Sequence, residues 1–252
     1  MLHWCIYIVL FISFVSGTPR IFRDYPKQQV LNNIIDNYIE AIGGREAWSK
    51  LITKEERVIL YKYPKPLLIA TGSDLDTVIK KSVIFLNKKT SQLKYKRYDS
   101  NDGFCLDGQT YFHFKDGEFI ESSEYTKYMY SACMMGVSEN FITKKTEDNL
   151  EYYGELKMDT VLCDVIKFKR KEWLRTYLYY FSKHNGLLIA SQPSPEDDYP
   201  LINRTMYYNN YRTINGIKMH TEELSYEYGQ LVSRAIIDAK FNVEVQDSIK
   251  CN

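Results

Sequence analysis

The stretch NYIEAIGGREAWSKL, residues 37–51, decides how the fold begins. The apolar residues leading into it have the spacing of one face of a helix, and they are Leu31, Ile34, Ile35, Tyr38, Ile39 and Ile42. We predict a helix over 25–42, with Pro26 in its first turn. Gly43-Gly44 ends it, because glycine adopts the left-handed conformation at little steric cost. A short second helix is expected over 45–52, with Trp48 on its apolar side.

After Thr53 the pattern changes to short, β-branched and aromatic runs, which are typical of strands. The predicted strands are 58–63, 82–86, 92–98, 109–114, 164–169, 175–181, 187–191, 204–212, 217–226 and 231–245. Asp-Gly and Asn-Gly pairs such as Asn185-Gly186 and Asn215-Gly216 separate them and indicate hairpins. Serial hairpins form an antiparallel sheet, and a sheet this long must curl or close. One segment, 122–145, has helical spacing instead.

The last predicted strand has two distinct faces. Ala235, Ile237, Ala239 and Phe241 point one way, while the residues between them point the other way. Small residues alternate with large ones on the first face, which leaves room for a ligand or for a tightly packed helix. We predict that a cavity is lined by these residues of the strand and by two of the first helix, namely Ile35, Ile39, Ala235, Ile237, Ala239 and Phe241.

The first residues, MLHWCIYIVLFISFVSG, contain an apolar run of the length of a signal-peptide core, too short to span a bilayer. We predict a signal peptide over 1–17 and one mature domain over 18–252. The alternatives are a buried N-terminal strand or a short membrane anchor, and the segment before the apolar run lacks Lys and Arg.

Export would place four cysteines in an oxidising compartment: Cys105, Cys133, Cys163 and Cys251. They can form two disulfides in three pairings, or remain buried thiols. No pair has the C-x-x-C spacing of zinc or thioredoxin-like sites, and we expect no cofactor.

Net charge and the positions of the histidines give no support for nucleic-acid binding or for a catalytic or metal site. Lys and Arg number 33 against 32 Asp and Glu, a net charge of +1, so nothing favours a nucleic-acid partner. The mature histidines His113, His184 and His220 are far apart and match no catalytic or metal-binding motif, so we interpret them as structural or exposed.

Four further stretches carry a family resemblance: CLDGQTYFHF (105–114), YYGELKMDTVLCDVIKFKR (152–170), YLYYFSKHNGLLIAS (177–191) and MYYNNYRTINGIKMHTEE (206–223). These stretches follow the predicted first helix and the Gly43-Gly44 turn, which we call the glycine corner. Together these features resemble the outer-membrane lipoprotein-sorting superfamily of LolA and LolB, in particular its divergent Bacteroidetes-type members. It departs from that pattern at Met219-His220, where a proline is usual, and at Ser182, where an aspartate is usual.

The resemblance implies an α+β fold, a strongly curved antiparallel sheet (an incomplete or half β-barrel) with helices packed on its concave face. It also implies a non-enzymatic periplasmic protein that binds a lipid, a lipoprotein acyl chain or another apolar ligand between sheet and helix, in lipoprotein or lipid transport. An outer-membrane or envelope protein is the expected partner. The alternatives are an envelope interaction module whose cavity is filled, and a secreted enzyme, which a histidine–carboxylate pair converging in a pocket would favour.

Overall fold

The computed structural model describes residues 21–63, 78–87, 92–97, 103–107, 110–115, 118–121, 149–170, 175–195 and 204–243. Two helices come first within these ranges, α2 (Ile21–Ala41) and α3 (Gly44–Ser49). The first group of strands is β1 (Thr53–Lys62), β2 (Val78–Asn87), β3 (Gln92–Arg97), β4 (Gly103–Asp107), β5 (Thr110–Lys115) and β6 (Glu118–Glu121). The second group is β7 (Leu150–Met158), β8 (Val161–Arg170), β9 (Arg175–Ser182), β10 (Leu188–Pro193), β11 (Arg204–Asn209), β12 (Arg212–Ile214), β13 (Ile217–Met219), β14 (Glu222–Glu227) and β15 (Gln230–Phe241).

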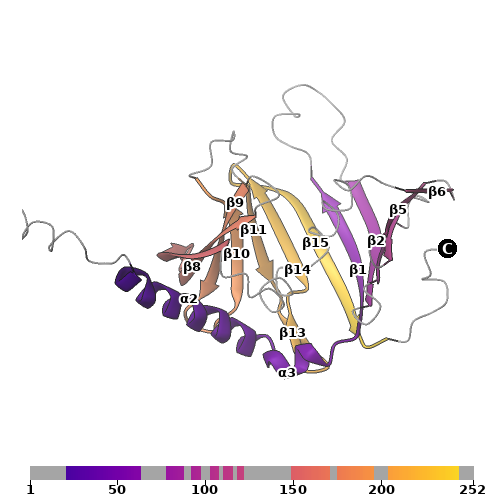
Figure 1. The fold of residues 1–252 in the computed structure, drawn as a ribbon. Helices are drawn as coiled ribbons and strands as arrows, with labels where there is room; N and C mark the ends of the chain where they lie inside the picture. Colours follow the sequence, from indigo (N-terminus) through magenta and orange to yellow (C-terminus); the bar gives the residue numbers. More distant parts are fainter. Residues whose placement is uncertain are drawn as a thin grey trace, which may run out of the picture.

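Thirteen of these strands form one antiparallel sheet in the order β6-β5-β4-β3-β2-β1-β15-β14-β11-β10-β9-β8-β7. Two meanders, one from each half of the chain, meet where β1 pairs with β15 from Lys54↔Phe241 to Lys62↔Ser233. Figure 1 shows β1 and β15 side by side in the middle of the molecule, with α2 and α3 along its lower side. β12 and β13 form a separate two-stranded hairpin.

The antiparallel sheet with helices against one face is confirmed. The described part of the chain is mostly β rather than α+β, and it does not show the sheet as strongly curved. All ten predicted runs contain strand, but the pattern did not predict β4, β6 or β7.

Two predicted runs are broken in the structure. The run 204–212 stops at Asn210, whose φ of 53° is left-handed and turns the chain out of the sheet. The run 217–226 is interrupted at His220 and Thr221, so His220 lies between β13 and β14 rather than inside a strand. Both breaks separate the small β12–β13 hairpin from the main sheet.

Helix α2 begins four residues before the predicted start, so Pro26 lies in its second turn rather than its first. The predicted apolar stripe is confirmed, since Leu31, Ile34, Tyr38 and Ile42 are buried. The predicted helix over 122–145 and the predicted signal peptide lie outside the described residues. Neither described helix is long and apolar enough to cross a membrane.

The glycine corner is the joint between α2 and the β12–β13 hairpin. Gly43 (φ 112°) and Gly44 (φ 79°) both have positive φ angles, as the sequence predicted. The carbonyl oxygen of Ile42 accepts hydrogen bonds from the Lys218 amide at 2.9 Å and the Trp48 indole at 3.1 Å. Trp48 is buried in the core, and Gly43 lies so close to Gly216 that the corner fixes the position of the hairpin.

Cysteine pairing is partly defined. Cys105 is disulfide-bonded, whereas Cys163 is a buried free thiol. Two disulfides among the four mature cysteines are therefore excluded, because Cys163 would have to take part in one of them.

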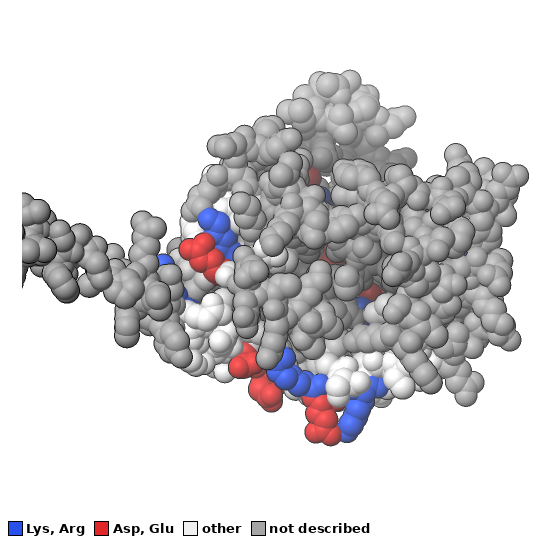
Figure 2. Space-filling model, in the orientation of Figure 1, with Lys and Arg blue, Asp and Glu red and all other residues white. Residues whose placement is uncertain are grey.

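Two ion pairs lie on the exposed side of the helices. Arg45 contacts Asp36 at 2.7 Å and Lys50 contacts Glu46 at 2.6 Å, all at exposed positions. Figure 2 shows acidic and basic residues next to one another along the lower margin, where α2 and α3 lie in Figure 1. The described residues of this margin therefore carry both signs of charge, and they form no purely basic patch of the kind that attracts a polyanion.

Candidate functional site

The six residues predicted to line a cavity lie on α2 and β15. Burial alternates along β15, where Ala235, Ile237, Ala239 and Phe241 are buried while Asp238 between them is exposed. On α2, Ile39 is buried and Ile35 is half-buried. The assignment of the β15 face is confirmed. That these six side chains line a ligand cavity stays a prediction, because none of them lines either of the two pockets described below.

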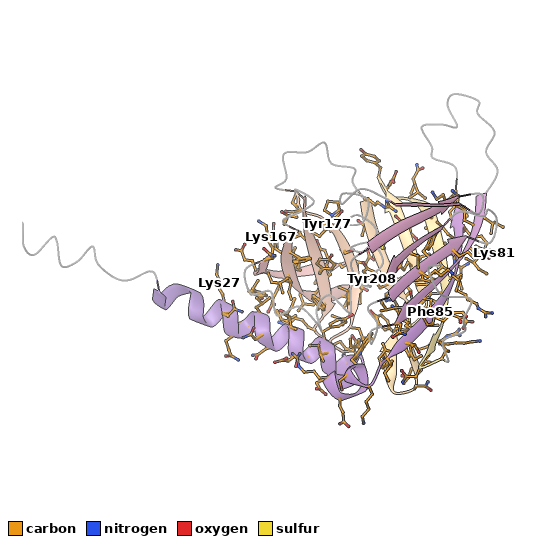
Figure 3. The ribbon with its side chains drawn as sticks, turned by 45° about the vertical axis from the view of Figure 1, so that its right-hand side comes forward. Lys27, Lys81, Phe85, Lys167, Tyr177 and Tyr208 are labelled. Atoms are coloured by element: carbon orange, nitrogen blue, oxygen red, sulfur yellow. The ribbon has the colours of Figure 1, made fainter. Side chains whose placement is uncertain are left out.

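Apolar side chains of α2 and of one sheet face pack into a single cluster. Its buried members from the sheet and hairpins are Ile166, Tyr179, Phe181, Leu187, Leu188, Tyr208, Ile217, Met219, Ile237, Ala239 and Phe241. The Tyr38 ring of α2 meets Phe181 edge to face, with centroids 5.1 Å apart. Partly buried side chains such as Phe168, Tyr177 and Met206 continue this face from the cluster, and Figure 3 shows Tyr177 and Tyr208 on the strands beyond α2.

A pocket of about 510 Å³ opens between α2 and the β9–β10 hairpin. Ile34 and Phe181, both members of the apolar cluster, form part of its lining. Asn37 lines it from the exposed side of the helix, and Gly186 approaches α2 so closely that an added Cβ would lie 3.0 Å from the Asn37 carbonyl oxygen. The volume is within the usual range of ligand pockets, and the pocket connects solvent with the helix–sheet core.

The other side of this pocket is polar. Lys183 contacts the Glu155 carboxylate and lies 3.8 Å from Asp164, and the Tyr152 hydroxyl donates to Asp164 at 3.5 Å. Burial raises the pKa of Asp164, and the Lys183 ammonium opposes this shift. The pocket therefore joins an apolar wall to a rim carrying both charges, an arrangement that suits an amphiphile.

A buried ion pair lies on the same sheet face at its junction with β1. Lys54 Nζ is 3.0 Å from Glu56 Oε1, and the two side chains are only 5% and 12% exposed. These residues lie opposite Phe241 and Ala239 of β15 in the register. The face that Ala239 and Phe241 share thus also carries two charges, which the sequence analysis did not predict.

His220 forms the histidine–carboxylate contact that would favour an enzyme. Its Nε2 lies 2.9 Å from Glu223 Oε1, and its ring stands 4.9 Å from that of Tyr208 and 5.9 Å from that of Tyr211. His220 is 8% exposed, and its Nδ1 is buried without a hydrogen-bond partner. His220 lines neither of the two pockets described here, and its ring packs between the rings of Tyr208 and Tyr211.

Burial also changes the acidity of the two tyrosines next to His220. It raises the pKa of Tyr208 and of Tyr211 well above the ordinary value. The Tyr208 hydroxyl is 2.9 Å from Ser191 Oγ, and the Tyr211 hydroxyl donates to the Leu188 carbonyl at 2.7 Å. Both hydroxyls therefore stay protonated and serve to tie neighbouring strands together.

The remaining candidates are easily placed. His184 is exposed in the β9–β10 turn, as predicted, and lines the pocket beside α2. His113 lies in β5, as predicted. Among the described residues, no group of three His, Cys, Asp or Glu side chains is placed to hold a metal ion.

The fold is similar to two solved structures. A LolA superfamily protein from Nitrosomonas europaea aligns with a TM-score of 0.55 and 12% identity, covering 86% of this chain and 96% of that one. A DUF1329 family protein from Desulfovibrio piger aligns with a TM-score of 0.53 and 13% identity, covering 86% and 95%. No family model and no curated protein matches the sequence. At these identities the likeness shows the fold alone, so the LolA-like architecture is confirmed and the Bacteroidetes-type lineage is not supported.

Proposed function

We propose that this chain is a non-enzymatic envelope protein that binds a lipid, a lipoprotein acyl chain or another apolar ligand between α2 and the sheet. The proposal includes secretion to the periplasm through the signal peptide over 1–17 and a single mature domain over 18–252. It rests on the LolA-like fold and on the resemblance of the sequence to proteins that hold acyl chains.

One structural observation carries the proposal: the pocket beside α2 joins Ile34 and Phe181 of the apolar cluster to the charged rim at Lys183. An acyl chain gains about 0.8 kcal/mol for each CH₂ removed from water, so apolar walls alone can hold it. The Lys183 and Asp164 side chains would meet its polar end. Entry of a longer chain requires α2 to move, because the helix–sheet interface beyond the pocket is packed.

That packing favours a second candidate, an envelope interaction module. Ile39, Ala235, Ile237, Ala239 and Phe241 are all at most 9% exposed, so other parts of the protein already cover the face that a ligand would use. In this second function the helix stays in place and the protein binds another envelope protein through its surface.

Native mass spectrometry of residues 18–252, purified without detergent, tests the two functions. We expect a co-purifying lipid or uptake of added palmitate, and loss of that uptake in Asn37→Trp, which places an indole at the pocket mouth. Asn32→Trp is the matched control, because Asn32 is also exposed on α2 and does not line the pocket. A ligand-free mass with no uptake of fatty acid or phospholipid would overturn lipid binding and support the interaction module.

A further inference from the structure

A second pocket lies on the sheet face that turns away from α2. It has a volume of about 520 Å³ and is lined from β11 by Thr205, Tyr207 and Asn209 and from β14 by Leu224 and Tyr226. Side chains alternate along a strand, and Tyr208 belongs to the cluster around α2, so Tyr207 points to the opposite face. The pairing Tyr207↔Leu224 places both residues on that face. This pocket is therefore separate from the site proposed above.

Two tyrosine rings form a corner in this pocket. The rings of Tyr207 and Tyr226 are 5.6 Å apart at 83°, and both are half-buried. Asp159, in the turn between β7 and β8, is exposed and also lines the pocket. The turn is held there because the Tyr207 hydroxyl donates to Met158 Sδ at 3.5 Å.

Among the described lining residues, the only charged side chain is that of Asp159. These residues include one carboxylate and no Lys, Arg or His. Arg234 lies opposite Leu224 in the register, but its guanidinium contacts Glu222 at 2.6 Å. Burial raises the pKa of Tyr207, and the charge of Asp159 raises it further, so its ring stays neutral.

We propose that this pocket binds a quaternary ammonium group, with the cation against the faces of Tyr207 and Tyr226 and paired with the Asp159 carboxylate. Aromatic faces attract cations through the ring quadrupole, and a corner of two rings with a nearby carboxylate surrounds a roughly spherical cation on several sides. Leu224 supplies an apolar wall for the methyl groups.

Calorimetric titration of residues 18–252 with choline and tetramethylammonium tests the proposal. We expect both to bind, and the neutral carbon isostere of choline, dimethylbutanol, to bind at least about tenfold more weakly, because it lacks the cation–π attraction. Asp159→Asn should weaken choline binding without affecting the fold, because Asp159 has a φ of 52° and asparagine tolerates that conformation.

Tyr226→Leu should abolish binding, and Tyr228→Leu is the control on the same hairpin, because Tyr228 is 70% exposed and does not line the pocket. Equal affinity for choline and dimethylbutanol, binding of N-acetylglucosamine in place of choline, or no binding of any ammonium probe would each overturn the proposal. Binding to phosphatidylcholine vesicles but not to phosphatidylglycerol vesicles would support it and place the ammonium on a lipid headgroup, whereas binding of free choline alone would support a soluble ligand.

Discussion

Replacing Gly43 by alanine tests the role of the glycine corner. The φ of Gly43 is +112°, and an added Cβ would lie 2.2 Å from the Gly216 carbonyl oxygen and 3.2 Å from the Ile217 Cα. These are backbone atoms, so the β12–β13 hairpin would have to move away from the corner. That movement would also disturb the 2.9 Å hydrogen bond from the Lys218 amide to the Ile42 carbonyl.

The expected cost has two parts. A non-glycine residue held at an unfavourable positive φ costs about 1–3 kcal/mol. Weakening the Lys218–Ile42 hydrogen bond adds about 0.5–1.5 kcal/mol. We therefore expect Gly43→Ala to lower the free energy of unfolding by about 2–4 kcal/mol, measured by urea denaturation of residues 18–252 with the disulfide intact.

Gly229→Ala is the matched control. Gly229 also has a positive φ, of +77°, but nothing lies within 4 Å of an added Cβ. It should therefore show the conformational cost alone, about 1 kcal/mol. If the two variants lose the same free energy of unfolding within about 0.5 kcal/mol, the close approach of Gly43 to the hairpin does not contribute to stability and the reasoning is wrong.

Three further predictions concern buried groups. Lys54→Met should lower the free energy of unfolding by about 3–5 kcal/mol in urea denaturation, because it leaves the Glu56 carboxylate buried without its partner at 3.0 Å. The double variant that also carries Glu56→Leu should recover much of that free energy. A Lys54→Met variant as stable as the parent would contradict this prediction. Cys163, whose pKa is raised by burial, should resist iodoacetamide in the folded protein and react once it is unfolded, as followed by the mass of the proteolytic peptide that contains Cys163; rapid labelling of that peptide in the folded protein would show that the thiol is accessible. Burial raises the pKa of Tyr180 from 10 to about 12, so the folded state holds that proton more tightly and the free energy of unfolding should fall as pH rises from 10 to 12; the fall should be smaller in Tyr180→Phe, and equal slopes would refute the assignment.

Local features of the fold could be predicted because each lies within a few residues of sequence. The stripe from Leu31 to Ile42 and the alternation from Ala235 to Phe241 both follow from the period of one element. The pair Asn215-Gly216 also predicted the hairpin in which it lies, because Asn and Gly readily adopt the positive φ angles that a two-residue hairpin turn requires.

Contacts between distant segments could not be predicted in the same way. The pairing of Lys54 with Phe241 joins residues almost 190 positions apart, and nothing local in either strand encodes that register. The pocket beside α2 was missed for the same reason, since it needs Asn37 and Lys183 to meet. His220 was assigned to a strand because its neighbours alternate, but hydrogen bonds between Thr221 and Asn210 hold the chain in a break there instead.

The seam between β1 and β15 has a consequence for how the protein is made. β15 is the last described strand to leave the ribosome, yet it is the middle strand of the thirteen. Until it arrives, β1 and β14 each present an open row of backbone donors and acceptors to other chains. Joining the two halves then requires a contact of high sequence separation, which is slow to form. The nascent chain therefore passes through a period in which its two meanders are separate and each has an unpaired edge. Shielding of those edges until β15 pairs would raise the yield of folded protein.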